Sequence, residues 1–221
     1  MPYFAIIPAA GSSVRMRADR PKQYLSVQGE PLLQRVINVF SAMPVIQKVV
    51  VTLHAKDHWW PSLTLSHPGK VSAVIGGKER VHSVLLGLAA LKEMVSPNDF
   101  VLVHDAARPF VTEKLIHDLM DAVKTDTVGG LVGLPVVDTI KQVDEKECVV
   151  KTISRTQLWQ AQTPQCFRYA ILKKAIEKAL SDKQVVTDES SAIEYFGHHP
   201  KMVMGDSRNR KITFSEDLLL L

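Results

Sequence analysis

The sequence lacks long hydrophobic runs and has little cysteine. No apolar run approaches the ~18 residues that a membrane-spanning helix needs. The two cysteines, Cys148 and Cys166, form no C-x-x-C pair, which argues against a disulfide framework and is typical of a reduced protein. We therefore expect a cytoplasmic location. A secretory leader is disfavoured because no Lys or Arg precedes the apolar run from Phe4 to Ala10.

Blocks of like charge are also missing. The 27 Lys and Arg residues against 23 Asp and Glu give a net charge of +4, and the basic residues are spread along the chain. A nucleic-acid-binding stripe is therefore not evident, whereas a mild positive balance suits a small polyanionic ligand. The eight His residues form no metal-binding signature, so no histidine-based metal centre is expected.

Two well-known phosphate-binding patterns, G-x-x-x-x-G-K-[ST] and G-x-G-x-x-G, are absent. The chain nevertheless begins with an apolar strand, residues 3–7, that runs into the small residues 8–13. Small residues let backbone N–H groups approach a ligand closely, and the cations Arg15 and Lys22 follow. These are the parts of a phosphate-holding loop. A tight strand-to-helix turn with solvated cations is the alternative interpretation.

Strand-like and helix-like segments alternate with short connections, which argues for an α/β fold with a mainly parallel sheet. The 221 residues, 46% of them hydrophobic, suffice for a single domain with a large core over 1–221. Pro31 suits the first position of a helix, and Thr112 suits a cap. The expected strands are 3–7, 48–53, 71–75, 100–103, 128–136, 201–204 and 211–214; the expected helices are 31–43, 79–94, 112–124, 168–180, one from 187–189 onward, and a terminal one capped by Ser215.

Residues 137–159 break this alternation. Two polar, β-rich runs, 137–143 and 148–154, flank the charged residues 144–147 and predict a projecting β-hairpin. An isolated two-stranded hairpin is marginally stable in water. We therefore expect this arm to pack on something, most simply on a second copy of the chain.

Polar or small residues follow four of the predicted strands: 8–15, 76–77, 105–108 and the loop that leads to Lys211. In an open α/β sheet, ligands bind beyond the carboxyl ends of the strands, so these features are expected to form one site. Asp105 directly follows a strand and suits a Mg²⁺ ion held between phosphates. An Asp that caps its own turn at a strand end is the alternative.

Several short motifs occur in one order along the chain. They are Pro8-Ala9-Ala10-Gly11 with Arg15-Met16, Pro21-Lys22-Gln23-Tyr24, Gly76-Gly77 with Arg80 and Ser83-Val84, His104-Asp105-Ala106-Ala107-Arg108-Pro109, Asp138-Thr139, Thr163-Pro164-Gln165, and Thr187-Asp188-Glu189. Each motif is modest alone, but their order and spacing are highly specific. Through them the chain resembles the 2-C-methyl-D-erythritol 4-phosphate cytidylyltransferases of the non-mevalonate isoprenoid pathway, over nearly its whole length.

The resemblance implies a Rossmann-like nucleotidyltransferase fold, a three-layer sandwich whose β-hairpin is a dimerisation arm. It implies transfer of CMP from CTP to 2-C-methyl-D-erythritol 4-phosphate, with Mg²⁺, in a homodimer interlocked by the arm. The products are 4-diphosphocytidyl-2-C-methyl-D-erythritol and pyrophosphate. A phosphate nucleophile needs no general base, so cations that neutralise developing charge are the expected machinery.

The resemblance also implies a role for each matching residue. Its catalytic residues are Arg15, Lys22, Arg155 and Lys211. Its CTP contacts are Pro8, Ala9, Ala10, Gly11, Gly77, Ser83 and Asp105, and Asp105 is also its metal ligand. Its contacts to methylerythritol phosphate are Arg108, Thr139, Arg155 and Thr163.

One position departs from the family pattern, and three alternatives stay open. The family loop often reads A-A-G-x-G-x-R-M, whereas Ser13 replaces the second Gly here; at a positive φ, Ser costs ~1 kcal/mol or more. The nearest alternative is a cytidylyltransferase for another polyol phosphate, such as ribitol 5-phosphate. A non-catalytic nucleotide-binding module is disfavoured because Arg15, Lys22, Asp105 and Lys211 occur together. A nucleic-acid-binding protein is the third alternative.

Overall fold

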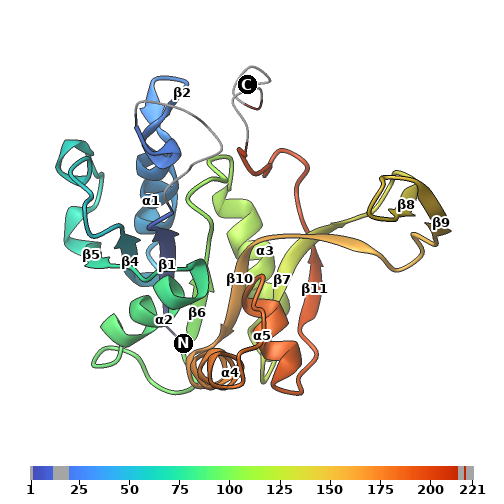
Figure 1. The fold of residues 1–221 in the computed structure, drawn as a ribbon. Helices are drawn as coiled ribbons and strands as arrows, with labels where there is room; N and C mark the ends of the chain where they lie inside the picture. Colours follow the sequence, from blue (N-terminus) through green and yellow to red (C-terminus); the bar gives the residue numbers. More distant parts are fainter. Residues whose placement is uncertain (1, 12–19, 214–216, 218–221) are drawn as a thin grey trace.

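The computed structural model describes residues 2–11, 20–213 and 217. Its centre is a seven-stranded sheet in the order β11-β7-β10-β6-β1-β4-β5 (Figure 1). Strand β1 pairs in parallel with β4 and β6, and the pairs β4–β5 and β7–β11 are also parallel. The predicted mainly parallel α/β sheet is therefore confirmed. The strands are β1 Tyr3–Ala9, β4 Ile46–Leu53, β5 Val71–Ile75, β6 Phe100–Val103, β7 Gly129–Pro135, β10 Trp159–Arg168 and β11 Lys201–Met204.

Strand β10 is antiparallel to both of its neighbours, β6 and β7. No strand is predicted there from the sequence, and that expectation is wrong. The segment looks like a loop because it contains Gln162, Thr163, Pro164 and Gln165. Pairing with β7 shifts between Ala161 and Gln165, and such an irregularity is where a sheet tolerates proline.

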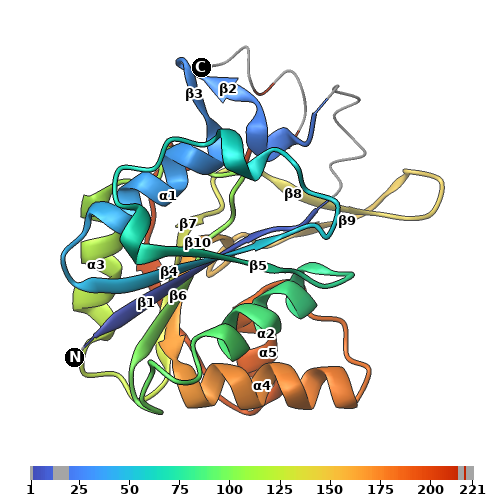
Figure 2. The ribbon, with the colours of Figure 1, turned by 90° about the vertical axis from the view of Figure 1, so that its left-hand side faces the viewer.

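Helices cover both faces of the sheet, which gives the predicted three layers (Figure 2). Side chains alternate between the two faces along a strand, so β1 contributes Ile7 to one core and Ile6 to the other. Helices α1 (Leu32–Ala42) and α3 (Glu113–Val123) pack on the Ile7 face. Helices α2 (Arg80–Ala90), α4 (Tyr169–Ser181) and α5 (Glu189–Tyr195) belong to the Ile6 face. No helix in the described part of the chain is long and apolar enough to cross a membrane.

The observed ends of the helices can be compared with the ends predicted from the sequence. The Thr112 hydroxyl accepts the Leu115 N–H at 3.2 Å, so the predicted cap of α3 is confirmed. Pro31 is not the first helical residue, because its ψ of 137° is extended and it pairs with Ser26 in a small hairpin. The helix predicted over 79–94 ends at Ala90, and turns follow it.

Short elements connect the larger ones. Strands β2 (Ser26–Val27) and β3 (Glu30–Pro31) form a hairpin, and 3-10 helices lie at Lys22–Tyr24, Trp60–Ser62 and Pro68–Lys70. The last two lie in the otherwise irregular connection between β4 and β5. The strand predicted over 211–214 is wrong for 211–213, where the Ile212 N–H donates to the Ala107 carbonyl at 2.8 Å without a ladder. Residue 214 and the helix predicted after Ser215 lie outside the described ranges.

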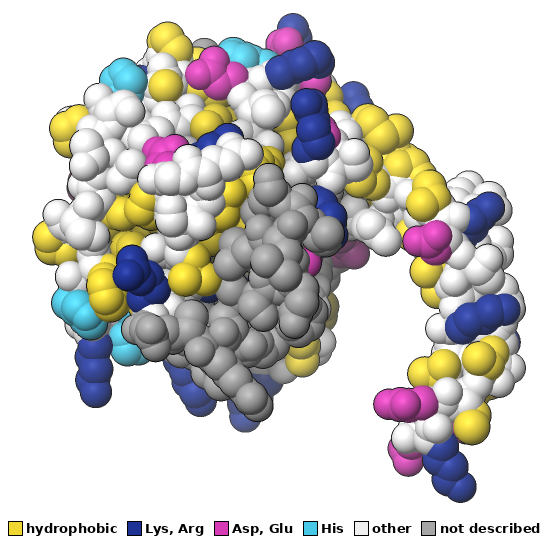
Figure 3. All heavy atoms as spheres, turned by 90° about the horizontal axis from the view of Figure 1, so that it is seen from above, with side chains coloured by type: hydrophobic (Ala, Val, Ile, Leu, Met, Phe, Trp, Pro, Cys, Tyr) yellow, Lys and Arg dark blue, Asp and Glu magenta, His cyan; other side chains and the backbone are white. Residues whose placement is uncertain are grey.

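The arm is present as a separate two-stranded sheet, β8 (Ile140–Val143) paired with β9 (Val149–Ile153). Both strands are shorter than predicted. Figure 3 shows the arm standing clear of the body, with hydrophobic side chains along its length. Val149 and Val150 are each 61% exposed, so the chain by itself leaves apolar parts of its arm uncovered.

Candidate active site

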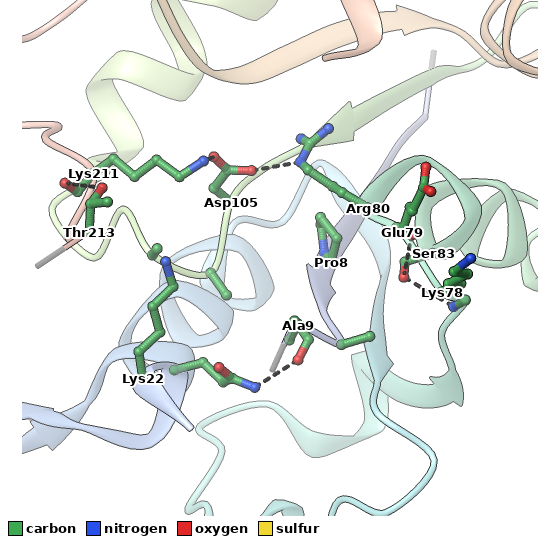
Figure 4. Close-up of a pocket in the computed structure, with 16 residues that line it drawn as sticks. Pro8, Ala9, Lys22, Lys78, Glu79, Arg80, Ser83, Asp105, Lys211 and Thr213 are labelled. Atoms are coloured by element: carbon green, nitrogen blue, oxygen red, sulfur yellow. Dashed lines mark hydrogen bonds and ion pairs between the residues drawn. The ribbon is translucent and has the colours of Figure 1, made fainter. Parts of the chain in front are cut away.

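A cavity of about 380 Å³ opens where β1 and β6 end. Figure 4 shows side chains entering it from several elements. It contains every residue predicted to contact CTP, together with Lys22 and Lys211, although their roles stay predictions. The lining residues are Pro8, Ala9, Ala10, Gly11, Lys22, Gln23, Gly77, Lys78, Glu79, Arg80, Ser83, Asp105, Ala106, Ala107, Lys211 and Thr213.

One end of the cavity is built from small residues in close contact. A Cβ atom on Gly77 would come within 2.4 Å of the His82 Cβ, and one on Gly76 within 2.7 Å of the Ala10 Cβ. The Gly77 N–H donates to the Ser83 hydroxyl at 3.1 Å. The Ser83 hydroxyl in turn donates to the Glu79 carbonyl at 3.2 Å. This end therefore presents backbone groups and small side chains to a ligand.

The short helix Lys22–Tyr24 carries two residues into the cavity. Gln23 is buried, and its side-chain amide donates to the Ala9 carbonyl at 2.8 Å. Lys22 Nζ donates to the Ile212 carbonyl at 3.3 Å. The Tyr24 hydroxyl donates to Asp57 at 2.8 Å and anchors the helix to the body. Gln23 stands in a quoted motif, yet no role is predicted for it from the sequence.

Asp105 lies between two cations at the other end of the cavity (Figure 4). Its Oδ1 is 2.9 Å from Arg80 Nε, and its Oδ2 is 2.8 Å from Lys211 Nζ. Burial alone raises the pKa of Asp105, but the charges of Arg80 and Lys211 outweigh burial and hold that pKa far below its usual range. Asp105 is therefore ionised at neutral pH and faces these cations. It does not act as a simple cap of its own turn.

Among the described residues that line the first cavity, one buried carboxylate, that of Asp105, could bind a metal ion. No group of three or more His, Cys, Asp or Glu residues that could hold a metal occurs in the described ranges. Glu79 also lines the cavity, but it is exposed. Mg²⁺ at nucleotide sites often takes one or two carboxylates, with phosphate oxygens and waters completing its shell. Asp105 fits this pattern because each of its carboxylate oxygens has a further lone pair beyond its contact with Arg80 or Lys211. Its metal role stays a prediction.

A second cavity of about 180 Å³ shares Arg80, Asp105 and Lys211 with the first. The predicted substrate contacts Arg108 and Thr163 both line it. Because the two cavities share three charged side chains, they lie next to each other. The remaining lining residues are Ala161, Gln162, Gln165, Thr187 and Asp188.

A buried network holds this second cavity in place. The Thr163 hydroxyl accepts the Asp105 N–H at 3.0 Å and lies 3.1 Å from His104 Nδ1. His104 Nε2 is 3.0 Å from the Arg108 carbonyl, which only accepts. The proton of neutral His104 is therefore on Nε2, and Thr163 donates to Nδ1. Burial lowers the pKa of His104 to about 4, so the ring is neutral at pH 7.

Two predicted residues do not reach the cavities, and a third cannot be placed. Thr139 and Arg155 are exposed on or beside the arm and line neither cavity. Arg15, with Ser13, lies outside the described residues. The body thus gathers most of the predicted site, whereas the arm carries two of its residues away.

Arg80 is the main site residue for which the sequence analysis predicts no role. It is the first residue of α2, it lines both cavities, and it bonds Asp105 through Nε. Its Nη1 and Nη2 donate to the two carboxylate oxygens of Glu189 at 2.6 and 2.9 Å. Its place just after Gly76-Gly77, at a strand end, is the signal that could have identified it. Glu189 belongs to the Thr187-Asp188-Glu189 motif, but the sequence alone predicts no contact between it and Arg80.

The fold and the site together define the class of the protein as a nucleotidyltransferase. The α/β sheet places a small-residue end and a cluster of cations in one cavity, beyond the carboxyl ends of parallel strands.

Comparisons with known proteins identify the family. The family model described as 2-C-methyl-D-erythritol 4-phosphate cytidylyltransferase matches residues 3–221. Proteins of that name from Aliivibrio fischeri and Pseudomonas aeruginosa are 45% and 44% identical to this chain. The alignments cover 97% of this chain and 90% of the former, and 99% of this chain and 94% of the latter. The chain therefore belongs to the 2-C-methyl-D-erythritol 4-phosphate cytidylyltransferase family.

Solved structures agree in fold. The crystal structure of the Francisella tularensis 2-C-methyl-D-erythritol 4-phosphate cytidylyltransferase has a TM-score of 0.86 and 36% identity, covering 100% of this chain and 98% of the other. The Thermus thermophilus structure of the same description has a TM-score of 0.82 and 30% identity, covering 100% of this chain and 97% of the other. The predicted fold class is thus confirmed independently of the sheet order.

Proposed function

We propose that this enzyme transfers CMP from CTP to 2-C-methyl-D-erythritol 4-phosphate and releases pyrophosphate. The observation that carries the proposal is the row of charges around Asp105, which joins the two cavities. One cavity suits a nucleoside triphosphate, and its neighbour suits a smaller phosphorylated alcohol. The names of the relatives support the identity of both substrates.

The CTP site runs from the small-residue end to the cations. The base lies against Ala10, Gly77 and Ser83, where backbone groups and one hydroxyl supply hydrogen bonds and no bulky side chain intrudes. Pro8, Ala9 and Gly11 line the same cavity. The triphosphate then extends toward Lys22 and Lys211, with Arg15 on the loop as a third cation.

The reaction is an in-line displacement at phosphorus. An oxygen of the alcohol's phosphate attacks the α-phosphorus of CTP, the bond to the β-phosphate oxygen breaks, and pyrophosphate leaves with that electron pair. The nucleophile is already anionic, so no side chain needs to remove a proton. Lys22, Lys211 and Arg15 neutralise the charge that develops on the phosphates. Mg²⁺, held by Asp105 and phosphate oxygens, would add further neutralisation when bound.

The second substrate occupies the smaller cavity. Arg108 and Thr163 line it. The Arg108 guanidinium supplies hydrogen-bond donors, whereas the Thr163 hydroxyl is engaged with His104 and Asp105 and holds the wall of the cavity. Thr139 and Arg155 are exposed and line neither cavity of their own chain. In the proposed enzyme, the arm of a partner subunit supplies these two residues to the site. The uncovered apolar side chains of the arm support a homodimer. The free thiol of Cys148, which is exposed, supports a reducing, cytoplasmic location.

A pyrophosphate-release assay tests the proposal. Purified enzyme with CTP and Mg²⁺ receives either 2-C-methyl-D-erythritol 4-phosphate or ribitol 5-phosphate in parallel. We expect release with the first alcohol phosphate and little with the second. Preference for ribitol 5-phosphate would replace the substrate, and CTP binding without any pyrophosphate release would favour a non-catalytic module.

A further inference from the structure

Glu189 is buried in a way that its place at a helix start does not require. An acid in the first turn of a helix is favourable even when it is exposed. Glu189 is instead 1% exposed, and both of its oxygens accept hydrogen bonds from Arg80. Replacing a buried ion pair with apolar residues is often neutral for stability. The pair therefore suggests a role in orienting Arg80.

The backbone around Glu189 is fixed to the sheet from both sides. The Gln165 side-chain amide in β10 donates to the Asp188 carboxylate at 2.9 Å. The oxygen of the same side-chain amide, Gln165 Oε1, accepts the Ser190 N–H at 2.8 Å. Asp188 also caps α5 by accepting the Ser191 N–H. Glu189 is thus carried by a rigid part of the body and not by a loose loop.

The geometry limits how Arg80 meets Asp105. A guanidinium group binds a carboxylate best through two parallel N–H bonds. Arg80 makes that two-bond contact with Glu189 and has only Nε directed at Asp105, at 2.9 Å. Asp105 Oδ2 stays with Lys211, at 2.8 Å. If Glu189 were neutral, Arg80 would compete for both oxygens of Asp105 and displace Lys211.

We propose that Glu189 is a positioning residue, which holds Arg80 in a one-bond contact with Asp105 so that Lys211 keeps its place for the phosphates. The arrangement also sets the charge of the site. Within this cluster, the three cations Arg80, Arg108 and Lys211 face the two anions Asp105 and Glu189, so the cluster itself carries one net positive charge. This inference rests on the proposed function, because the value of Lys211's position depends on phosphate transfer.

The test compares Glu189→Gln with Glu194→Gln, a matched change at an exposed position of the same helix. We expect kcat to fall about tenfold to a hundredfold in Glu189→Gln, as when residues that orient reactive groups are replaced. Glu194→Gln should match wild type. Calorimetry with cytidine, which has no phosphates, should give wild-type affinity and stoichiometry in both variants. A fall in cytidine stoichiometry that accounts for the lost turnover would overturn the proposal.

A double-mutant cycle with Arg80→Gln shows whether Glu189 acts through Arg80. If it does, Arg80→Gln/Glu189→Gln should be no slower than Arg80→Gln alone, because Glu189 then has nothing to orient. Losses that multiply would contradict the proposal. The double variant buries no unpaired charge, so it also provides a folded sample if Glu189→Gln does not yield one.

A spectroscopic measurement separates this inference from the proposed function. The Arg80 Nε–H resonance is identified in ¹⁵N-labelled enzyme by its absence in Arg80→Gln. We expect it to shift in Glu189→Gln and to stay in place in Glu194→Gln. An unchanged resonance would overturn the inference even if the enzyme turns over as proposed. If the resonance shifts but the wild-type enzyme does not turn over CTP and the alcohol phosphate, the inference about Arg80 holds and the proposed function is refuted.

Discussion

The body and the arm hold their functional residues in opposite ways. In the body, Asp105 is buried and bonded to cations from two other segments, so its position is set within one chain. On the arm, Thr139 and Arg155 are exposed, and nearby Val149 and Val150 are uncovered. The body therefore fixes its charged side chains within one chain, whereas a partner that covers the arm and fixes its side chains is part of the proposal.

The largest effect is expected inside the body. Lys22→Ala removes a cation from the proposed path of the triphosphate, and cations with such roles in phosphoryl transfer are worth about 10³ to 10⁵ in rate. We expect a loss of turnover in this range with little change in melting temperature. Arg15→Ala is expected to behave alike. Lys114→Ala, at an exposed position of α3, is the control; near-normal kcat in Lys22→Ala would remove Lys22 from the mechanism.

The second prediction tests whether the arm serves its own chain or a partner. Arg155→Ala should lower kcat by about 10² to 10³, the cost of removing one group that stabilises charge in the transition state. Mixing these chains with Lys22→Ala chains should then restore activity. A mixed dimer has one site with both lesions and one with neither, so random exchange predicts about a quarter of wild-type activity.

Exchange has to be confirmed by mass before the mixed sample is interpreted. A mixture of Lys22→Ala chains with Lys22→Ala/Arg155→Ala chains is the control, because neither arrangement contains an intact site. If mixed dimers form and stay inactive, Lys22 and Arg155 act in the site of the same chain. The contrast between a self-sufficient body and a dependent arm would then be wrong.

The third prediction concerns the buried charge of the body. Asp105→Asn keeps the shape but removes the anion between Arg80 and Lys211, and we expect turnover to fall about 10²-fold. Stability should fall as well. Because the pKa of folded Asp105 lies below its unfolded value, its contribution is full above about pH 4 and is lost progressively below that.

Urea unfolding of wild type and Asp105→Asn at neutral and acidic pH measures this. The difference in free energy of unfolding should narrow only below about pH 4. Asp118→Asn, an exposed residue paired with Lys114, is the control and should show almost no difference. If wild type and Asp105→Asn differ by the same free energy of unfolding at every pH, the charge of Asp105 does not stabilise the body.

For His104 we expect the smallest effect on turnover. Its replacement should instead change how the free energy of unfolding depends on pH. Its folded pKa of about 4 lies below the ordinary 6.5, so the unfolded chain binds a proton that the folded chain does not. Stability should therefore fall as pH drops from 6.5 to 4, by about 2–4 kcal/mol. His104→Gln should lose this dependence. Urea unfolding of wild type, His104→Gln and the exposed control His117→Gln at several pH values measures this dependence. If the free energy of unfolding of His104→Gln still falls between pH 6.5 and 4 as in wild type, another group causes the fall.

Local patterns in the sequence determined much of the fold. The structure confirms three predictions that depend only on neighbouring residues: the apolar first strand, the cap at Thr112 and the β-hairpin within 137–159. The small residues after β1 and the Gly76-Gly77 turn also lie where the strand ends predict, because parallel strands direct their carboxyl ends to one edge of the sheet. The family resemblance came from the order of such local motifs.

Other features depend on the tertiary structure alone. Strand β10 contains Gln162, Thr163 and Pro164, and its polar side chains become acceptable only once distant residues pair with them. Helix α5 brings Glu189 to Arg80 across 109 positions of sequence. No local periodicity encodes such a contact, because an ion pair depends on distance in space. The sequence by itself therefore determined which residues carry charge and where strands end, and the packing of β10 and α5 decided which of those charges meet.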